Sequence, residues 1–255
     1  MVSVLFRGDL GVRLKVINSG SSGNGYSLIS EAGEILLLEC GVKGIEMKRA
    51  IDFRVGNVIG CLLTHIHKDH SGRIKDYLNS GIKVYTSDEV ASDILTVTGE
   101  KTVPLQRMRK KKLGGFTVIP FRVPHNGTEC DGWLITHKKI GRLLFITDAE
   151  YCPYDFSKMG ITHAMIECNY SEDYIKNDAE NLSHVLRGHM ELQTCKRLIQ
   201  TIESPELRSV GLIHLSSQNS DLERFRQEIR EVVDCDVDVW VADKGFETEL
   251  SLEPF

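Results

Sequence analysis

The sequence predicts one α/β domain over residues 1–255, built of two packed β-sheets with helices on the outside. Three observations support this fold class. Short apolar runs typical of buried strands recur in both halves of the chain, and helical patterns follow several of them. The histidine-rich stretch 64–70 comes directly after one such run, where open α/β folds place their ligand sites. No repeat, low-complexity segment or linker divides the 255 residues.

The composition is that of an ordinary soluble globular protein, with 41% apolar and 26% charged residues. A net charge of −5 argues against a generally basic nucleic-acid-binding surface and leaves room only for a local patch. Residues 1–15 lack the apolar core of a signal peptide, and no apolar run approaches the ~20 residues of a membrane span. The seven scattered cysteines indicate reduced thiols, so we expect a cytoplasmic protein with no membrane contact.

Strands are predicted where short apolar or alternating runs lie between turn residues. Two of these runs, 26–29 and 35–38, are expected to form a hairpin that turns at 32–33. The predicted strands are 14–17, 26–29, 35–38, 59–63, 82–85, 116–123, 133–136, 143–146, 164–166, 209–213, 236–241 and 248–252.

Helices are predicted from apolar residues at helical spacing. The stripe of Cys195, Leu198, Ile199 and Ile202 marks one of them. Another is expected to turn Leu222, Phe225, Ile229 and Val232 inward, with Ser216 and Asn219 as its caps. The predicted helices are 45–51, one that begins near Ser71, 87–95, 188–202 and 219–232.

Two polar segments have alternative interpretations. The Ser/Gly loop 18–25 is either a flexible turn or a concavity of backbone N–H groups close to an anionic substrate. The basic run 107–112 is either a solvated loop between strands or a guide that draws a phosphate backbone toward the site.

The stretch from Thr64 to His70 is the strongest functional signal in the sequence. Side chains alternate along a strand, so His65 and His67 should point the same way as the chain leaves the strand. Asp69 and His70 then follow the chain into the turn and can face a second point nearby. This arrangement suits two metal ions that share one opening.

Three more metal-competent residues each follow a predicted strand. Alone, a histidine or an aspartate at such a place would more often be structural, but several imidazoles and an acid in one turn need a cation. Imidazole and carboxylate donors without thiolates suit zinc, manganese or iron(II). The candidate metal ligands are His65, His67, Asp69, His70, His125, Asp148 and His214.

This pattern resembles the metallo-beta-lactamase-fold hydrolases, which carry H-x-H-x-D-H, then a histidine, an aspartate and a late histidine. The resemblance spans nearly the whole chain and implies a metallo-beta-lactamase-like αββα sandwich of two mixed sheets with outer helices. It also implies the metal assignment. His65, His67 and His125 would hold the first ion, Asp69, His70 and His214 the second, and Asp148 would bridge both.

Several short segments resemble those of one subgroup, the small stand-alone YycJ/WalJ-type members, which look like nucleases or phosphodiesterases. The segments that carry this likeness are 18–24, 167–170, 188–190, 214–216 and 242–245. One departure from the family is Glu39 in Glu39-Cys40-Gly41, where the family usually has aspartate. We expect this difference to affect the fine tuning of the metal site and not its presence. The 65 residues between Asp148 and His214 leave no room for a β-CASP domain.

The resemblance implies a phosphodiesterase with two divalent metal ions, zinc first and manganese second, that acts on DNA or RNA, most simply as an exonuclease. A hydroxide that bridges two ions about 3.5–4 Å apart would attack phosphorus in line. Asp69 would ligate one ion and orient this hydroxide. His189, expected at a helix start, is the candidate proton donor or phosphate contact, and His184 is the alternative.

Other functions remain open from the sequence. The modest net charge favours hydrolysis of a small cyclic or diester phosphate, and thioester hydrolysis is a more distant option. A non-catalytic nucleic-acid-binding protein that retains the fold would be expected to lack one or two ligands, whereas this set is complete. The oligomeric state, with a homodimer among the choices, is not determined.

Overall fold

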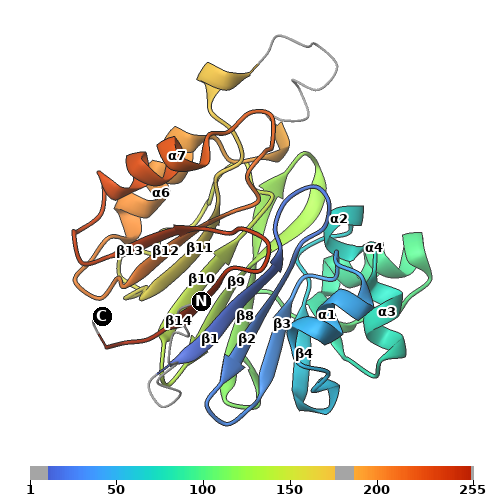
Figure 1. Cartoon of the computed structure of the whole chain (residues 1–255). Helices are drawn as coiled ribbons and strands as arrows, with labels where there is room; N and C mark the ends of the chain where they lie inside the picture. The colour runs from blue at the N-terminus through green and yellow to red at the C-terminus, as the bar shows by residue number, and fades with distance from the viewer. Residues whose placement is uncertain (1–10, 176–186, 254–255) are drawn as a thin grey trace.

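Two mixed β-sheets of seven strands each pack face to face in the computed structural model, which describes residues 11–175 and 187–253 (Figure 1). The first sheet has the order β14-β1-β2-β3-β4-β5-β6, and the second has β13-β12-β11-β10-β9-β8-β7. The strands of the first are β1 (Val12–Asn18), β2 (Gly25–Ser30), β3 (Ile35–Leu38), β4 (Val58–Leu62), β5 (Val84–Ser87), β6 (Val103–Leu105) and β14 (Glu247–Leu250). Those of the second are β7 (Lys111–Leu113), β8 (Phe116–His125), β9 (Thr128–His137), β10 (Gly141–Ile146), β11 (His163–Glu167), β12 (Ser209–Ile213) and β13 (Asp238–Val241).

Helices cover the outer face of each sheet, so the layers follow the αββα order (Figure 1). On the first sheet lie α1 (Gly44–Ala50), α3 (Ile74–Asn79) and α4 (Asp88–Thr98), with the short α2 (Lys68–Ser71) at its upper edge. On the second lie α6 (Leu192–Ile202) and α7 (Leu222–Arg230). Two 3-10 turns, Val55–Asn57 and Glu172–Tyr174, complete the regular elements of the described residues.

The four layers explain why the strands are apolar on both faces. In β3, Leu36 and Leu38 pack into the core between the sheets, while Ile35 and Leu37 pack against the helices of the first sheet. A strand whose two faces are both covered has no position left for polar alternation. The continuous apolar runs of the sequence are the consequence.

The predicted elements agree with the structure in type, but several ends differ and two short strands were not predicted. The strand 209–213 was predicted to the residue, whereas the short β6 and β7 were missed. Helix α6 begins at Leu192, because Glu191 caps it through its carboxylate, so the expected start at Gly188-His189 was wrong. Asp221, not Ser216 or Asn219, caps α7, and Leu222 is exposed instead of inward.

The topology brings strand ends together at one edge of the sandwich. Strands β10, β11 and β12 are parallel neighbours, and β8 is parallel to β10 because each is antiparallel to β9. Their carboxyl ends therefore meet at the same edge, which is where α/β folds bind ligands. Strand β4 brings the stretch 64–70 to this edge from the first sheet.

All seven cysteines are free thiols in the structure, and the sulfur atoms of Cys40 and Cys61 lie 3.4 Å apart. None of the helices in the described part of the chain combines the length and the apolar character that crossing a membrane requires.

His163, at the start of β11, gives a prediction about acid stability. Burial lowers its pKa to about 3, so the folded protein keeps this imidazole neutral, and its Nδ1 lies 2.8 Å from Ser209 Oγ. Below the unfolded pKa of about 6.5 only the unfolded chain takes up this proton, and stability is lost as the pH falls. His163 alone should lower the free energy of unfolding by about 2 kcal/mol between pH 7 and pH 5.

The His163→Asn variant isolates this effect, because the metal-site histidines titrate equally in both proteins. Urea unfolding is measured at pH 7 and pH 5 in the presence of a chelator. The decrease in the free energy of unfolding between the two pH values should be about 2 kcal/mol smaller in the variant than in wild type. Parallel pH profiles for the two proteins would contradict the prediction.

Candidate metal centre

The stretch 64–70 leaves β4, turns, and enters α2. His65 and His67 lie before the helix, and Asp69 and His70 lie inside it, not in a turn as expected. His65 and His70 are fully buried, whereas His67 and Asp69 are partly exposed at the surface of the site. The Nδ1 of His65 lies 2.9 Å from Thr64 Oγ1, so its Nε2 is the nitrogen that faces the site.

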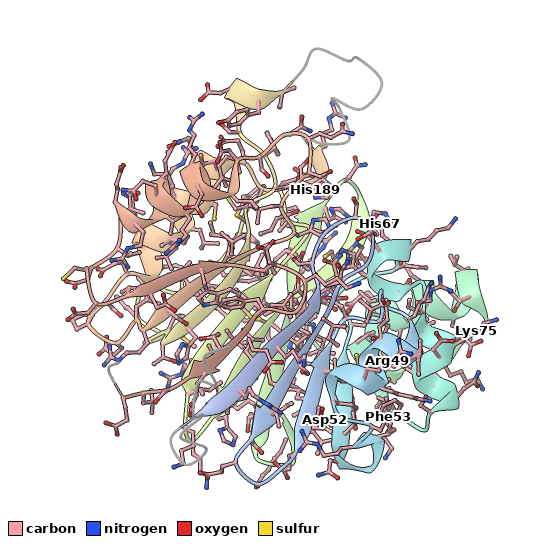
Figure 2. The ribbon with its side chains drawn as sticks, viewed as in Figure 1. Arg49, Asp52, Phe53, His67, Lys75 and His189 are labelled. Atoms are coloured by element: carbon pink, nitrogen blue, oxygen red, sulfur yellow. The ribbon has the colours of Figure 1, made fainter. Side chains whose placement is uncertain are left out.

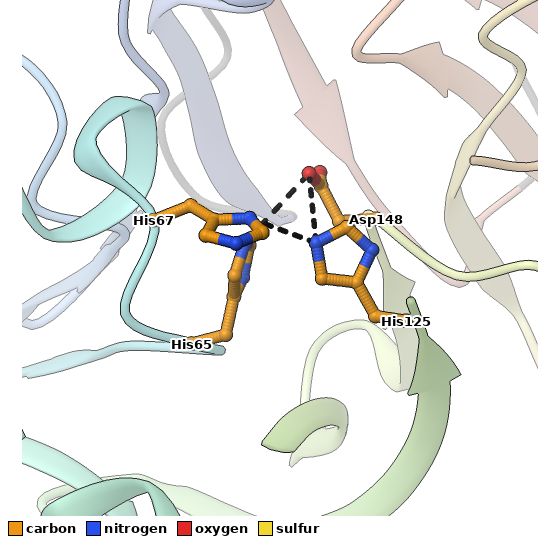
Figure 3. A group of neighbouring side chains, drawn as sticks. All are labelled: His65, His67, His125 and Asp148. Atoms are coloured by element: carbon orange, nitrogen blue, oxygen red, sulfur yellow. Dashed lines mark hydrogen bonds and ion pairs between the residues drawn. The ribbon is translucent and has the colours of Figure 1, made fainter. Parts of the chain in front are cut away.

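The first group of candidate ligands is His65, His67, His125 and Asp148 (Figure 3). One donor atom of each lies within 4.8 Å of the others. His67 Nδ1 and His125 Nε2 are 2.9 Å apart, and Asp148 Oδ2 lies 3.7 Å from His65 Nε2 and 3.8 Å from His125 Nε2. Figure 3 shows His65 and His67 facing His125 and Asp148 across a small gap.

The second group is Asp69, His70, Asp148 and His214. Asp69 Oδ2 lies 3.3 Å from His70 Nε2 and 3.1 Å from His214 Nε2. Asp148 Oδ1 lies 3.1 Å from His70 Nε2. Since Asp148 turns one oxygen to each group, the two groups together could hold two metal ions that share this carboxylate.

A third group contains a residue that the sequence analysis missed as functional. Glu167, the last residue of β11, is fully buried and lies beside His189 and His214. Its Oε1 accepts hydrogen bonds from His189 Nδ1 at 2.7 Å and His214 Nδ1 at 3.0 Å. Its Oε2 accepts from the backbone N–H groups of Ala149 and Met190. The rule that found His125, Asp148 and His214, a polar residue at a strand end, would have found Glu167 too.

Contacts behind the site fix which nitrogen faces inward in three of the histidines. His125 donates from Nδ1 to the Gly188 carbonyl at 2.6 Å, and His214 donates from Nδ1 to Glu167. The Nδ1 of His70 faces the buried Glu39 carboxylate at an ion-pair distance of 3.4 Å, without a hydrogen bond. In each ring the Nε2 lone pair is then directed toward the site, as metal-binding histidines require.

The Ser/Gly loop 18–25 is folded onto the site. His214 donates its backbone N–H to Ser19 Oγ at 2.9 Å, and Asn24 donates its backbone N–H to the Asp69 carbonyl at 2.7 Å. A Cβ at Gly41, which bonds to Asn24, would lie 1.7 Å from that same carbonyl. The flexible-turn interpretation is therefore wrong, because the loop is bonded to two candidate ligands.

Three residues of the site have left-handed backbone conformations: Glu39 with φ 67°, Asp148 with φ 48° and His214 with φ 53°. Residues other than glycine adopt this conformation at a cost of about 1–3 kcal/mol, and such residues cluster at functional sites. Here the conformation turns each side chain from its strand end into the shared space.

The donor set fits metal ions. The buried Nε2 of His65 has no hydrogen-bond partner among the described residues, which is costly unless a cation completes it. Burial lowers the pKa of His65, His67 and His125, so these rings are neutral and able to ligate. Against burial, the Asp148 carboxylate raises the pKa of His70 and raises that of His214 to about 10, which shows an excess of negative charge at the second group. A metal ion would neutralise this charge.

A cavity of about 370 Å³ opens over the two groups. His67, Asp69, Asp148, His189 and His214 line its floor. Its other walls are mostly polar: Ser21 of the Ser/Gly loop, Asn169, and the segment 215–219 that follows β12, in which Leu215 is the apolar residue. His189 lies at this cavity but precedes α6 instead of beginning it, and Figure 2 shows it across the site from His67. His184 lies outside the described residues.

The basic run does not border this cavity. Arg107 is held by carboxylates, with Asp131 Oδ1 at 2.7 Å and Glu129 Oε2 at 2.8 Å. Lys111 and Lys112 lie on β7 beside Val118 and Thr117, near the start of β8, whereas His125 is at the other end of that strand. Within the run only residues 108–110 are an exposed loop, so the solvated-loop interpretation holds for that part alone, and the placement does not support a guide to the site.

Comparisons with known proteins agree with this architecture. The model of the beta-lactamase superfamily domain matches residues 45–215. The metallo-beta-lactamase-fold protein YhfI from Bacillus subtilis superposes with a TM-score of 0.74 at 20% identity, over 94% of this chain and 99% of YhfI. No curated protein sequence is significantly similar to the chain.

Two further solved structures share the fold. A diphosphatase from the PhnP family has a TM-score of 0.67 at 15% identity and covers 94% of this chain and 98% of its own. The short form of human tRNase Z has a TM-score of 0.61 at 16% identity, and the match covers 93% of this chain and 99% of the tRNase Z chain. With the αββα layers and the His/Asp clusters, the match over residues 45–215 shows that this chain belongs to the beta-lactamase superfamily and is a metallo-beta-lactamase-fold hydrolase.

Proposed function

We propose that this protein is a dinuclear metal-dependent phosphodiesterase that hydrolyses the phosphodiester bonds of nucleic acids, from a strand end. The observation that carries the proposal is Asp148, which faces two groups of imidazole and carboxylate donors beneath one polar cavity. Two-metal sites of this kind suit in-line displacement at phosphorus, because charge develops on both the attacking and the leaving oxygen.

The ligand assignment is part of the proposal. His65, His67 and His125 would hold one ion, Asp69, His70 and His214 the other, and Asp148 would bind both. Zinc, or else manganese, suits these donors. Bound there, two such ions would supply Lewis acidity and lower the pKa of a water molecule toward neutrality.

The chain's own residues would orient the substrate and move one proton. Asp69 reaches the cavity between His70 and His214 and can orient an attacking water as well as bind metal. His189 lines the cavity and donates its Nδ1–H to Glu167, which raises the pKa of the ring against the effect of burial and so favours the imidazolium form. In that form Nε2 also carries a proton, which it would give to the leaving oxygen as the P–O bond breaks. Glu167 would act as a positioning residue for both His189 and His214.

The similar structures support chemistry at phosphorus, since one is a diphosphatase from the PhnP family and another is a tRNase Z. The loop 18–25 and the segment Gly188-His189 support placement with the YycJ/WalJ-type members. We further propose that residues 1–255 form one domain and that the free thiols indicate a cytoplasmic location.

A small cyclic or diester phosphate is the second candidate substrate. The cavity of about 370 Å³ is within the size range of small-molecule sites. The complete donor set argues against a non-catalytic nucleic-acid-binding protein, which would have no need to keep both groups.

Metal removal and labelled strands test the proposal. Chelator-treated protein should lose hydrolysis of bis-p-nitrophenyl phosphate and recover it on addition of zinc or manganese. Metal-loaded protein should shorten 5′- and 3′-labelled DNA or RNA stepwise from one end, and His67→Ala serves as the inactive control. Intact strands together with hydrolysis of the small diester would support the second candidate, and no hydrolysis of any substrate would refute both.

A further inference from the structure

A second, electropositive cavity lies between α1 and α3, outside the metal centre. It has a volume of about 470 Å³, and its charged lining residues are Lys43, Lys48, Arg73 and Asp76. Within the ranges 11–175 and 187–253, none of the three cations has an ion-pair partner. Asp76 is already engaged, since its Oδ2 accepts the backbone N–H of Gly44 at 3.0 Å. The four charged side chains of the cavity therefore carry a net charge of +2.

Backbone hydrogen bonds join this cavity to the metal centre. The N–H of Cys40 donates to the His70 carbonyl at 2.7 Å, and the N–H of Arg73 donates to the Cys40 carbonyl at 2.9 Å. Arg73 thus follows the candidate ligand His70 by three residues. Lys43 follows Cys40, the residue bonded to His70, by three residues. Lys68, exposed between His67 and Asp69, adds a positive charge on α2, at the edge of the sheet above α1 and α3 (Figure 1).

An exposed aromatic ring lies at the other end of α1. Phe53 is 62% exposed and has φ 57°, an unusual conformation for a bulky residue. Its N–H donates to the Lys48 carbonyl at 2.7 Å, which ties it to the cavity wall, and Figure 2 shows it beyond Arg49. Cations that follow a phosphate backbone, together with an aromatic ring for base stacking, are the features of single-strand binding surfaces.

We propose that the cavity of Lys43, Lys48 and Arg73 binds phosphates of a single-stranded nucleic acid away from the bond that is cut, and that Phe53 stacks on one of its bases. The inference rests on the proposed function and deepens it. A small diester would occupy the metal centre alone and gain nothing from this cavity. A strand that spans both sites would bind more tightly, because the cations of the cavity would neutralise some of its phosphate charges.

Binding and hydrolysis separate this inference from the proposed function. The triple variant Lys43→Gln, Lys48→Gln, Arg73→Gln is compared with Lys110→Gln, Lys111→Gln, Lys112→Gln, which removes the same charge around β7. Binding of a fluorescent, phosphorothioate-linked single strand to metal-loaded protein is measured by anisotropy at several salt concentrations. Hydrolysis of bis-p-nitrophenyl phosphate is measured in parallel.

The cavity variant should bind the strand at least about tenfold more weakly, and its slope of log affinity against log salt should be shallower by ~2. Its kcat/KM for the small diester should stay within about twofold of wild type, because no metal-centre residue is changed. Phe53→Ala should weaken binding about tenfold, whereas Met108→Ala, equally exposed and also left-handed, should not.

Equal effects of the two triple variants, or no binding by wild type, would overturn the inference and leave the proposed function standing. Loss of binding to phosphatidylserine vesicles without loss of strand binding would also overturn it, in favour of a membrane contact. A wild-type protein that binds the strand but hydrolyses neither substrate would refute the proposed function, while the variants would still test the cavity.

Discussion

Replacing Asp148 with asparagine is expected to lower metal-dependent phosphodiester hydrolysis by at least about 10³-fold. The residue contributes one carboxylate oxygen to each group of donors, so its loss affects both proposed ions at once. Asparagine keeps the side-chain shape and tolerates the left-handed backbone at this position, so the fold should persist. The change therefore removes charge and ligation without adding backbone strain.

Metal analysis joined to kinetics checks this prediction. The Asp148→Asn protein should bind fewer than two metal ions per chain, whereas Asp155→Asn, which changes an exposed turn carboxylate, should bind as many as wild type. Full activity of Asp148→Asn with two bound ions would show that Asp148 is not a shared ligand.

The sequence was sufficient to predict most of the strands and which polar residues at their carboxyl ends meet. His125, Asp148 and His214 follow strands whose apolar character is local and strong, and the strand-end rule of α/β folds predicts their convergence. The same rule applies to Glu167, but a single carboxylate in the segment 167–170 is not part of a metal-binding motif that would single it out. Its role depends on contacts with residues 22 and 47 positions later in the chain.

Features that depend on tertiary contacts could not be predicted. The start of α6 is set by the Glu191 side chain, which competes with the pattern that suggested Gly188-His189. The position of the basic run followed from the pairing of β7 with β8. The electropositive cavity unites Lys43 and Arg73 from segments 30 residues apart, through Cys40 bonded to both His70 and Arg73.

Replacing Glu167 with glutamine is expected to lower kcat by about 10²-fold and to weaken binding of the second metal ion by about 10- to 100-fold. Glu167 accepts four hydrogen bonds, two from imidazoles and two from backbone N–H groups, and glutamine has only one accepting end. If the glutamine oxygen accepts the two backbone N–H groups, the NH2 group of its side chain faces the Nδ1 atoms of His189 and His214. Both rings must then accept at Nδ1 and carry their proton on Nε2.

That change of tautomer has different consequences for the two rings. For His214 it removes the Nε2 lone pair that would bind metal. For His189 the loss of the carboxylate removes the interaction that raises the pKa of the ring, so the imidazolium form that would donate the proton is less populated. A His189→Gln variant should lower kcat but leave metal affinity unchanged, so metal titration separates the two roles of Glu167. Adding His189→Gln to Glu167→Gln should reduce kcat by less than the product of the single effects, because both changes act on one proton donor. Multiplicative effects, or a Glu167→Gln protein with normal metal affinity, would show that Glu167 supports the fold and does not position the histidines.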